Sequence, residues 1–459
     1  MQATVERTGP VAYSAFRSWV EVVVVSNSKM PLILAGLVAW ALFPLGAVRP
    51  MPFNVLVVAV AICFAGWAIT RGREETSGTG NYPGITKQAL PLVAAAALAV
   101  FHLCLHFFYP GQADPYAMLT SAKLLITLLL FYIMAATTTS TSSAFHTTIY
   151  ALLVIMFAEG LYGLLNLLAG NELLLFYERW ASFESSTGTL VNRNHFAYLI
   201  EMSLPLALAS GLLFAPVQRD TRRSTDSEAT ARRIMAVTAT SVLGLALIFS
   251  RSRMGIFSLL AAAATVAAAN ALLKPGSGRS RKGYALPALL VLVLGGFALV
   301  IGIDPVLERF FRIPQDLEHG RLPIWKASLA MWREAPLLGH GWGSYESLWP
   351  AWAGRPTGLH YKHAHNEYLQ VLAEGGLAGA AVVAWALWLF GRRVLRALSR
   401  PLTHAQRAVT VALATGITSV AFHSAADFGL RVPGVALVFA LVVALFVRVT
   451  DNPELVDRA

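Results

Sequence analysis

The sequence predicts an all-α polytopic membrane protein with about 12 transmembrane helices and one large loop between spans 9 and 10. Hydrophobic residues make up 56% of the 459 positions, whereas charged residues make up 13%. The surface of a soluble chain of this length needs more charge than that. Apolar runs long enough to cross about 30 Å of hydrocarbon recur along the whole chain.

Twelve apolar stretches are candidate spans. They cover about 31–48, 53–70, 88–108, 118–137, 146–170, 195–216, 233–249, 254–273, 285–303, 369–390, 406–424 and 430–449. The expected domains are an N-terminal cytoplasmic or interfacial segment (1–30), spans one to nine (31–303), a loop domain (304–368), spans ten to twelve (369–449) and a cytoplasmic tail (450–459).

The distribution of basic residues predicts which side of the membrane each loop occupies. An even number of spans puts both termini on one side, and the loops and tails of that side hold most of the 36 Lys and Arg residues. Because cytoplasmic loops are enriched in Lys and Arg, both termini are expected in the cytoplasm. This loop bias also explains the net charge of +11, so no nucleic-acid partner is predicted.

The sequence predicts neither a metal nor a cofactor. Its only two cysteines, Cys63 and Cys104, lie within apolar runs, so no disulfide framework or CxxC site follows. The sequence contains no G-x-S-x-G motif, no Walker loop and no His/Asp cluster at metal-ligand spacing. An anionic substrate that arginines bind without a metal is the simplest interpretation.

The unusual polar stretches all fall on the outer side in this orientation. They are FESSTGTLVNRNHFAY before the sixth span, SRSRMG between the seventh and eighth, the segment 304–368, and HSAADFGLR around the last turn. A purely structural protein has no reason to sort its polar residues in this way. Their convergence on one face predicts a functional site there.

Four outer arginines indicate an anionic ligand. Arg251 and Arg253 stand in the SRSRMG turn, Arg193 lies beside His195, and Arg321 opens a helix of the large loop. A guanidinium keeps its charge at all relevant pH values, and its planar fork matches phosphate oxygens. The alternative is that these arginines only extend to the outer interface, where a long side chain keeps its charged end in water.

The stretch HAHNEYLQVLAEGGLAG, residues 363–379, contains a candidate general base. In a helix, His365 shares one face with Tyr368 and Leu372, so it leads an apolar stripe toward the membrane. The EGG triplet at 374–376 is expected to interrupt this helix, and a broken helix is tolerated beside a cavity or packed protein. Histidine titrates near neutrality, so His365 can take a proton from a hydroxyl nucleophile.

His363, Asn366, Glu367 and Asp427 are candidate substrate-binding residues near this histidine. Glu367 or Asp427 could also serve as the base or orient the imidazole. In the competing interpretation, Asn366 caps a short helix and the two histidines only precede it. Asp427 would then be a turn residue.

The segment 304–368 is too long for a plain connector in a compact fold. It is expected to hold an amphipathic helix over about 320–334, a glycine-rich turn at 339–343 and short helical pieces after it. Five tryptophans fall here, Trp325, Trp332, Trp342, Trp349 and Trp352. They form either an aromatic belt at the interface or surfaces that stack on sugars or line a lipid groove.

Together these stretches resemble the O-antigen ligase and O-antigen polymerase superfamily of bacterial inner-membrane glycosyltransferases. The strongest similarity is HNEYLQVLAEGGLAG, where His365 and Asn366 are followed, after nine residues, by Gly376 and then by Gly379. The stretches TLVNRNHFAYLIEMSLPLALA and HSAADFGLRVPG are also similar to sequences common in this superfamily. The resemblance covers about residues 185–435.

Two arginine motifs add to the resemblance. SRSRMG is similar to the family's outer Ser-Arg turn, with Arg253 as the first counterpart and Arg251 as the second. GRLPIWKASLAMWREAPLLGHGWGSY is similar to the start of the family's large periplasmic loop, with Arg321 as its arginine.

The resemblance implies a metal-independent, inverting transferase whose active face is periplasmic. Its donor would be a glycan on undecaprenyl diphosphate, and its acceptor would be a hydroxyl of lipid A-core or of another glycan. His365 would activate that hydroxyl, and Arg253 and Arg321 would hold the diphosphate and stabilise it as it leaves. The large loop would cover the site and exclude water.

Several functions stay open at this point. Ala380 and Ala381 follow the glycines where the family often has threonines, so a repeat-unit polymerase is an alternative to a ligase. Transfer to protein is a third possibility. A transporter of lipid-linked glycan or of an anion belongs to a different class, and Lys123 and Glu201 within predicted spans are consistent with it. A non-catalytic assembly subunit is a weaker fourth.

Overall fold

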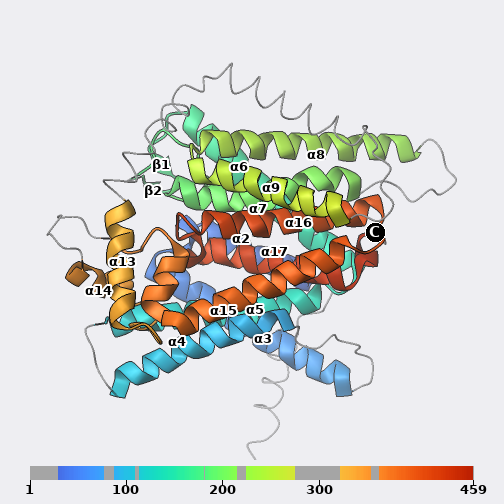
Figure 1. Ribbon diagram of the computed structural model, residues 1–459. Coiled ribbons are helices and arrows are strands. Elements are labelled where there is room, and N and C mark those ends of the chain that lie inside the picture. Colours follow the sequence, from blue (N-terminus) through green and yellow to red (C-terminus); the bar gives the residue numbers. More distant parts are fainter. Residues whose placement is uncertain are drawn as a thin grey trace, which may run out of the picture.

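The computed structural model describes residues 29–76, 87–108, 113–179, 181–213, 224–273, 321–352 and 361–457. Nearly all of the expected N-terminal segment 1–30 lies outside these residues, as do the ninth expected span, 285–303, and parts of the large loop. The described chain is a bundle of long helices with one small two-stranded sheet (Figure 1).

Every expected span that falls within the described residues coincides with a helix. These helices are α2 (Met30–Leu42), α3 (Pro50–Thr76), α4 (Leu90–Phe108), α5 (Pro115–Thr138), α6 (Ser142–Leu168), α7 (Arg193–Leu213), α8 (Ser224–Phe249), α9 (Arg253–Leu273), α15 (Glu367–Leu398), α16 (His404–His423) and α17 (Pro433–Asp451). In the described part of the chain, 7 helical stretches are long and apolar enough to cross a membrane. The chain is therefore an all-α polytopic membrane protein, and the number of twelve spans stays a prediction.

The first helix is shorter than the expected span 31–48. α2 has 13 residues and ends at Leu42, whereas about 20 residues are needed to cross a bilayer. Pro44 follows, and it has no N–H group with which to continue the helical hydrogen bonds. The chain then turns through the 3-10 helix η1 (Leu45–Ala47), in which all three residues have positive φ angles.

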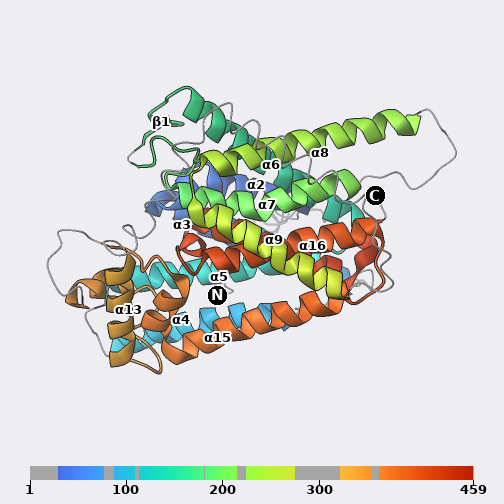
Figure 2. The same ribbon diagram turned by 45° about the horizontal axis from the view of Figure 1, so that its top comes forward.

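Helix α17 lies at the centre of the bundle. Its apolar window is 89% buried, against 17–39% for the other candidate spans. It packs against α2, α5, α7 and α16, and α16 also packs against α7 and α9. Figures 1 and 2 both show α8 and α15 on opposite sides of this central layer.

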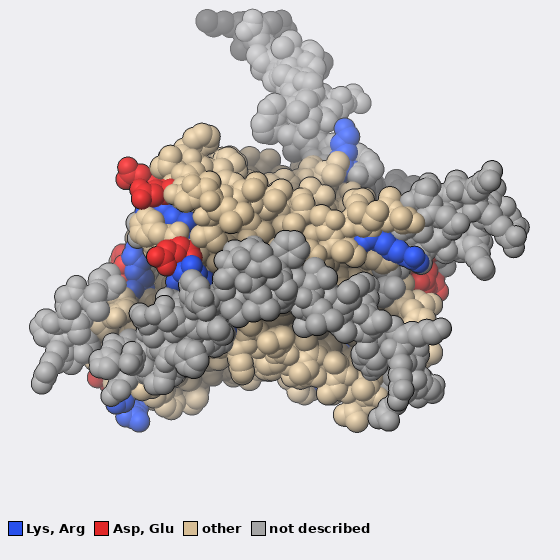
Figure 3. Space-filling view, turned by 90° about the horizontal axis from the view of Figure 1, so that it is seen from above, with Lys and Arg blue, Asp and Glu red and all other residues tan. Residues whose placement is uncertain are grey.

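Large apolar side chains are exposed around the outside of the bundle. Val58, Val154, Phe257 and Leu260, on three different helices, are examples. On the face seen in Figure 3, the charged side chains lie mostly toward the two ends of the molecule, with uncharged surface between them. An exposed apolar belt of this kind suits contact with hydrocarbon.

The described part of the large loop forms short helices at one end of the bundle, which we name the α13 end. The elements at this end are α13 (Leu322–Glu334), α14 (Tyr345–Leu348), η5 (Trp349–Trp352), β1 (Leu173–Leu174) and β2 (Tyr177–Glu178). Figure 1 shows α13, α14, β1 and β2 on one side of the bundle, away from the C-terminus. α13 coincides with the expected amphipathic helix.

The glycine-rich turn follows α13 as expected. Gly339, Gly341 and Gly343 have φ angles of 71°, 106° and 91°, a region that glycine enters without a steric penalty. A Cβ atom on Gly339 would lie 2.4 Å from the backbone of Glu374. The turn therefore packs directly against α15.

Helix α15 is broken at Gly376, within the EGG triplet that predicted an interruption. Gly376 has φ 58° and ψ −156°. Backbone groups of the loop replace the missing helical hydrogen bonds, because Leu377 N–H donates to Pro336 O at 2.8 Å and Ala378 N–H donates to Leu337 O at 3.0 Å. The break is thus a joint between α15 and the large loop.

The loop tryptophans also hold this region together. Three of them donate hydrogen bonds from the ring N–H group. Trp325 donates to Ala364 O at 3.1 Å, Trp332 donates to Pro336 O at 3.2 Å, and Trp352 donates to Glu334 Oε1 at 2.8 Å. The indoles of Trp342 and Trp349 are buried. At least part of this tryptophan set therefore stabilises the loop, and its expected contact with lipid or sugar stays a prediction.

Candidate active site

Asp427 lies at the centre of the polar residues of the α13 end. It follows α16 in the turn that leads to the 3-10 helix η6 (Gly429–Arg431), and its side chain is fully buried. His365 Nδ1 lies 3.4 Å from Asp427 Oδ1, which also accepts a hydrogen bond from Phe428 N at 2.9 Å. Asn194 Nδ2 donates to Asp427 Oδ2 at 2.5 Å. Both carboxylate oxygens are thus occupied.

A fourth segment joins through Ser252, which lies in the SRSRMG turn. Ser252 Oγ donates to Asn194 Oδ1 at 3.0 Å. This bond fixes which end of the Asn194 amide faces Asp427, because the oxygen is taken by the serine. Ser252, Asn194, Asp427 and His365 thus form one hydrogen-bonded chain, which we name the His365 relay. It connects four of the sequence stretches that were expected to converge.

Two members of the His365 relay, Asn194 and Ser252, were not predicted as site residues. Both stand inside polar stretches that were expected to converge on a site, so these stretches indicated their position. Their residue types did not indicate a site role, because Asn and Ser near the start of a helix usually act as caps.

The electrostatic environment of the relay favours an ionised Asp427. Burial would raise the pKa of this carboxyl group, but the hydrogen bond from His365 and the electrostatic interactions with His195, His365 and His423 outweigh it and lower the pKa. Asp427 is therefore an anion at neutral pH. An anion beside Nδ1 stabilises a proton on that nitrogen and leaves Nε2 as the basic atom of His365.

The backbone and exposure of His365 are consistent with a functional position. Its φ angle is 49°, a left-handed conformation that residues other than glycine adopt rarely and that is enriched at functional sites. Its side chain is 30% exposed, whereas that of Asp427 is fully buried. The imidazole can therefore reach a substrate while its partner stays out of water.

His363 lies close to His365 but differs in its protonation. Ala364 N–H donates to Gln370 Oε1 at 3.0 Å, so Gln370 Nε2 is the group that donates to His363 Nδ1 at 3.1 Å. This assigns the proton of the neutral ring to Nε2. Desolvation and the charge of Arg431 lower the pKa of His363 well below its ordinary value. His363 is thus neutral, and its expected substrate contact stays a prediction.

Three histidine rings surround Phe428. The ring centroids of His195, His363 and His365 lie 4.8, 4.3 and 4.8 Å from the Phe428 centroid. The apolar ring keeps the imidazoles apart. Among the residues that the structure describes, no group of three or more His, Cys, Asp or Glu residues is arranged to hold a metal ion.

Asn366 and Glu367 make contacts within the protein. Asn366 Oδ1 accepts a hydrogen bond from Leu369 N at 3.1 Å, so Asn366 caps α15. Glu367 Oε2 accepts from Arg431 Nε at 3.1 Å. The capping role that was weighed against substrate binding is therefore present for Asn366, and the expected substrate contacts of both residues stay predictions.

The predicted arginines occupy different surroundings. Arg251 has a left-handed φ of 53°, and its Nη1 lies 2.8 Å from Glu184 Oε2. Arg253 is the first residue of α9 and directly follows Ser252 of the relay. Arg321 directly precedes α13 and is half-buried.

The N-terminal turn of α13 lies over residues 363–365, which we name the histidine loop. Trp325 on this turn donates to Ala364 O, between His363 and His365. Arg321 precedes Trp325 by four residues, and residues at this spacing share a helix face. Arg321 thus lies within one helical turn of the contact between α13 and the loop that carries the candidate base.

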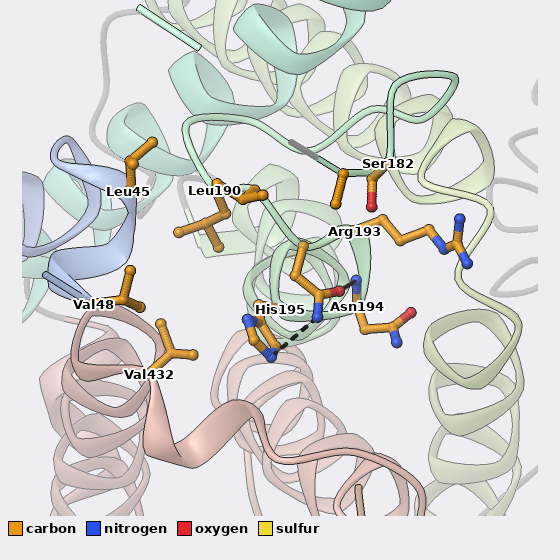
Figure 4. Close-up of a pocket in the computed structure, with 11 residues that line it drawn as sticks. Leu45, Val48, Ser182, Leu190, Arg193, Asn194, His195 and Val432 are labelled. Carbon is orange, nitrogen blue, oxygen red and sulfur yellow. Dashed lines mark hydrogen bonds between the residues drawn. The ribbon is translucent and has the colours of Figure 1, made fainter. Parts of the chain in front are cut away.

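A cavity of about 400 Å³ opens beside the relay, a size typical of ligand sites. Its lining includes the apolar residues Leu45, Val48, Leu190 and Val432 and the polar residues Asn192, Arg193, Asn194 and His195. Asn192 Nδ2 lies 3.5 Å from His195 Nε2. Figure 4 shows that the Arg193 guanidinium extends away from His195. Through Asn194, the cavity shares a wall with the His365 relay.

A second buried acidic group lies deeper in the bundle. Glu201 Oε1 lies 2.6 Å from His423 Nδ1, and Ser419 Oγ donates to Glu201 Oε2 at 2.6 Å. Tyr198 stacks on the His423 ring with centroids 4.0 Å apart. Glu201 is thus paired inside the protein, as buried charges usually are.

One part of the chain matches a family of known proteins. A family model described as O-antigen ligase matches residues 238–384, and no curated protein matches the chain. The matched segment contains Ser252, Arg253, Arg321 and His365, whereas Asn194 and Asp427 lie outside it. This match over residues 238–384 supports the O-antigen ligase superfamily, which the resemblance predicted.

Proposed function

We propose that this protein is a glycosyltransferase that transfers a glycan from undecaprenyl diphosphate to an acceptor hydroxyl on the periplasmic face of the bacterial inner membrane. In this proposal the loop domain 304–368 is periplasmic and both termini are cytoplasmic. The acceptor is lipid A-core or a similar glycan. The observation that carries the proposal is the His365–Asp427 pair, whose exposed member lies within the segment that matches the O-antigen ligase family.

His365 acts as the general base. Its Nε2 atom takes the proton of the acceptor hydroxyl, and the resulting oxygen nucleophile attacks the anomeric carbon. The bond from that carbon to the diphosphate oxygen breaks with its electron pair, so one displacement inverts the anomeric centre. Asp427 stabilises the imidazolium ion that forms. Positioned general bases accelerate such reactions by roughly 10²–10⁴-fold.

The arginines bind the leaving diphosphate and stabilise its charge. Negative charge grows on the diphosphate as the glycosidic bond breaks, and fixed guanidinium groups stabilise that charge without reorganising. Arg253 directly follows Ser252 of the relay in sequence, and Arg321 directly precedes α13, whose Trp325 donates to Ala364 O. Arg193 and Arg251 are further candidates for the donor side, and Arg251 would first have to leave Glu184.

A polymerase is the second candidate function. It would use the same base and the same donor, and it would differ only in taking the growing glycan as acceptor. The match to the O-antigen ligase family supports both activities, because they share this chemistry. Transfer to a protein acceptor would also use these residues.

The test uses purified protein, a synthetic glycan on undecaprenyl diphosphate and two acceptors, lipid A-core and the free repeat unit. His365→Ala is expected to abolish transfer while membrane insertion and abundance stay normal. The matched control is His404→Ala, because His404 is an exposed histidine at the start of α16, far from the α13 end. Wild-type transfer by the His365 variant would refute the role of His365 as base.

The choice of acceptor separates the candidate functions. Product on lipid A-core indicates a ligase, and extended repeats indicate a polymerase. If the wild-type protein transfers to neither acceptor but moves the intact donor across a sealed vesicle membrane, the transporter alternative is correct.

A further inference from the structure

We propose that Arg431 is a positioning residue that sets the distance between His365 and Asp427. It does so by binding Glu367 and Glu374, which lie on the first turns of α15, while it is itself part of the turn that carries Asp427. This inference rests on the proposed function, because it names a residue that prepares the same site. We call Arg431, Glu367 and Glu374 the arginine clamp.

The geometry of the arginine clamp is a buried guanidinium between two carboxylates. Arg431 Nε lies 3.1 Å from Glu367 Oε2, and Arg431 Nη1 lies 2.8 Å from Glu374 Oε2. The side chains of Arg431, Glu367 and Glu374 are 13%, 11% and 1% exposed. A guanidinium can hold two acceptors at once because its donors point in fixed directions within one plane.

The arginine clamp joins the same two chain segments as the catalytic pair. Glu367 follows His365 by two residues, and Arg431 follows Asp427 by four residues. The segments also meet through their backbones, because Glu367 N–H donates to Ser424 O at 2.8 Å. A change in the clamp therefore moves His365 relative to Asp427 before it affects more distant parts of the site.

Glu374 connects the arginine clamp to the rest of the α13 end. Its Oε1 atom accepts from Gln370 Nε2 at 3.1 Å and from Tyr345 N at 3.3 Å. Gln370 also donates to His363. The carboxylate thus ties the broken part of α15 to both the large loop and the histidine loop.

Stability alone does not explain why charged groups occupy this place. Removing charges from water is costly, and well-packed apolar residues often replace a buried ion pair with no loss of stability. What an apolar contact lacks is direction, whereas hydrogen-bonded ions fix the distance and angle between their parent segments. Such precision matters here, because a misplacement of about 1 Å in a reacting group can cost roughly 10²-fold in rate.

The first experiment measures kcat and KM for the donor in Arg431→Met and Arg431→Lys. The methionine variant is expected to lose about tenfold to a hundredfold in kcat with KM within about twofold, because substrate contacts stay intact. Lysine keeps the charge, so its loss of kcat is expected to be smaller than that of methionine. A loss is still expected, because lysine cannot hold both carboxylates with one planar fork. A wild-type kcat in the methionine variant would overturn the proposal, as would a change confined to KM.

The control variant is Arg393→Met. Arg393 is 14% exposed, is paired with Asp451 and lies at the far end of α15, so it matches Arg431 in burial and type of contact. Both methionine variants are expected to lower the melting temperature, and only Arg431→Met is expected to lower kcat. Equal losses of kcat would mean that Arg431 acts only through global stability.

A double-mutant cycle shows whether Arg431 acts through the catalytic pair. Residues that work as a unit are not additive, so Arg431→Met should cost less than about twofold once Asp427→Asn has already disrupted the pair. Full additivity of the two losses would show that Arg431 contributes by another route and would overturn the proposal.

Hydrogen exchange tests the arginine clamp without any substrate. In Arg431→Met the amides of residues 364–370 are expected to exchange faster, and in Arg393→Met they are expected to keep their wild-type protection. Unchanged protection in Arg431→Met would refute the arginine clamp, whether or not the kcat of the variant falls. If the wild-type protein has no transferase activity but the exchange result holds, the proposed function fails and the structural role of Arg431 stands.

Discussion

Buried arginines lie at both ends of this molecule, but they bind different partners. At the α13 end, Arg431 binds two carboxylates from another segment. At the opposite end, Arg407 donates to Leu398 O at 3.1 Å and to Arg400 O at 2.9 Å, and Arg448 donates to Ala136 O.

Two of the carbonyl groups at the opposite end, Leu398 O and Ala136 O, belong to the last turns of α15 and α5. The final four carbonyls of a helix have no partner within it, and they carry the negative end of its dipole. Arginine side chains such as Arg407 and Arg448 satisfy these groups and stabilise the helix ends. Every helix offers such carbonyls, so this use of arginine requires no specific partner residue.

The carboxylates at the α13 end come from specific residues that tertiary folding brings together. Asp427 contacts the partly exposed imidazole of His365, and Glu367 and Glu374 bind Arg431. The arginines of the opposite end contact mostly backbone. Buried charges thus occur at both ends of the molecule, so burial of a charge does not by itself indicate function. A buried charge is informative when its partners are side chains from distant segments and when the network reaches the surface at a reactive group.

Among the variants that test this comparison of the two ends, the largest expected effect is that of Asp427→Asn. The amide keeps the shape of the carboxylate but cannot stabilise the imidazolium ion, and its N–H can turn toward Nδ1 and shift the ring proton to Nε2. We expect kcat to fall by roughly 10²–10⁴-fold. Single-turnover transfer with saturating donor measures this loss.

The control for Asp427 is Asp451→Asn, which removes the carboxylate partner of Arg393 at the opposite end. Its kcat is expected to equal that of the wild type. If the Asp427 variant also transfers at the wild-type rate, the two ends do not differ as described here.

A smaller effect is expected for Arg253→Lys and Arg321→Lys. Lysine keeps the charge but loses the bidentate fork, and one charge-assisted contact contributes on the order of 1.5–3 kcal/mol. Each variant is expected to lose about tenfold to a hundredfold in rate, with donor handling affected more than acceptor binding.

Arg396→Lys is the matched control, because Arg396 is exposed on the last turns of α15. A donor titration at saturating acceptor separates the variants. Wild-type turnover by both Arg253→Lys and Arg321→Lys would show that these arginines only extend to the interface, and the transporter alternative would gain support.

Two glycines of α15 test the joint between this helix and the large loop. Gly376→Ala introduces a side chain where φ is 58° and where a Cβ would lie 2.5 Å from backbone atoms of Leu337. We expect a loss of about 1–3 kcal/mol in stability, together with looser loop docking. Gly391→Ala in the same helix meets nothing within 4 Å and is expected to be neutral or slightly stabilising.

Thermal unfolding in detergent, followed for both glycine variants, checks this prediction. Equal melting temperatures for the two variants would mean that the break at Gly376 is not a strained joint.

Removal of an arginine at the opposite end is expected to affect stability alone. Arg407→Met leaves the carbonyls of Leu398 and Arg400 without their donor, so a loss of roughly 1–3 kcal/mol is expected. The kcat per folded molecule should stay at the wild-type value. A fall in kcat that persists after correction for the folded fraction would show that the opposite end contributes to the reaction.

The smallest expected effect is that of a chelator. If arginines supply the positive charge at the leaving group, transfer in excess EDTA should proceed at the untreated rate. Loss of transfer that one divalent cation restores would reveal a metal site and would replace the arginine-only mechanism.

Much of the fold was predictable because its signals are local. Apolar length marked every span within the described residues, and the EGG triplet marked the break in α15. The site was predictable in part. His365 and Asp427 were both candidates, but their direct contact was only one of several options.

The remaining errors and omissions have physical causes. The expected span 31–48 ran past Leu42 because residues 45–47 are apolar in type, whereas their backbone turns. Arg431 was overlooked because a single arginine near a membrane end is usually a surface residue. Nothing in its own neighbourhood indicates that two carboxylates from α15 lie beside it.

The sequence by itself determined the membrane class, the helices and the type of chemistry available, because apolar length, glycine breaks and residue types are properties of short stretches. Only the tertiary structure decided which polar residues meet. Asn194 and Asp427 are 233 positions apart, and Arg431 and Glu367 are 64 apart. Contacts at such separations depend on how α7, α15 and α16 pack, and that packing is set by the sum of many apolar contacts over the whole bundle.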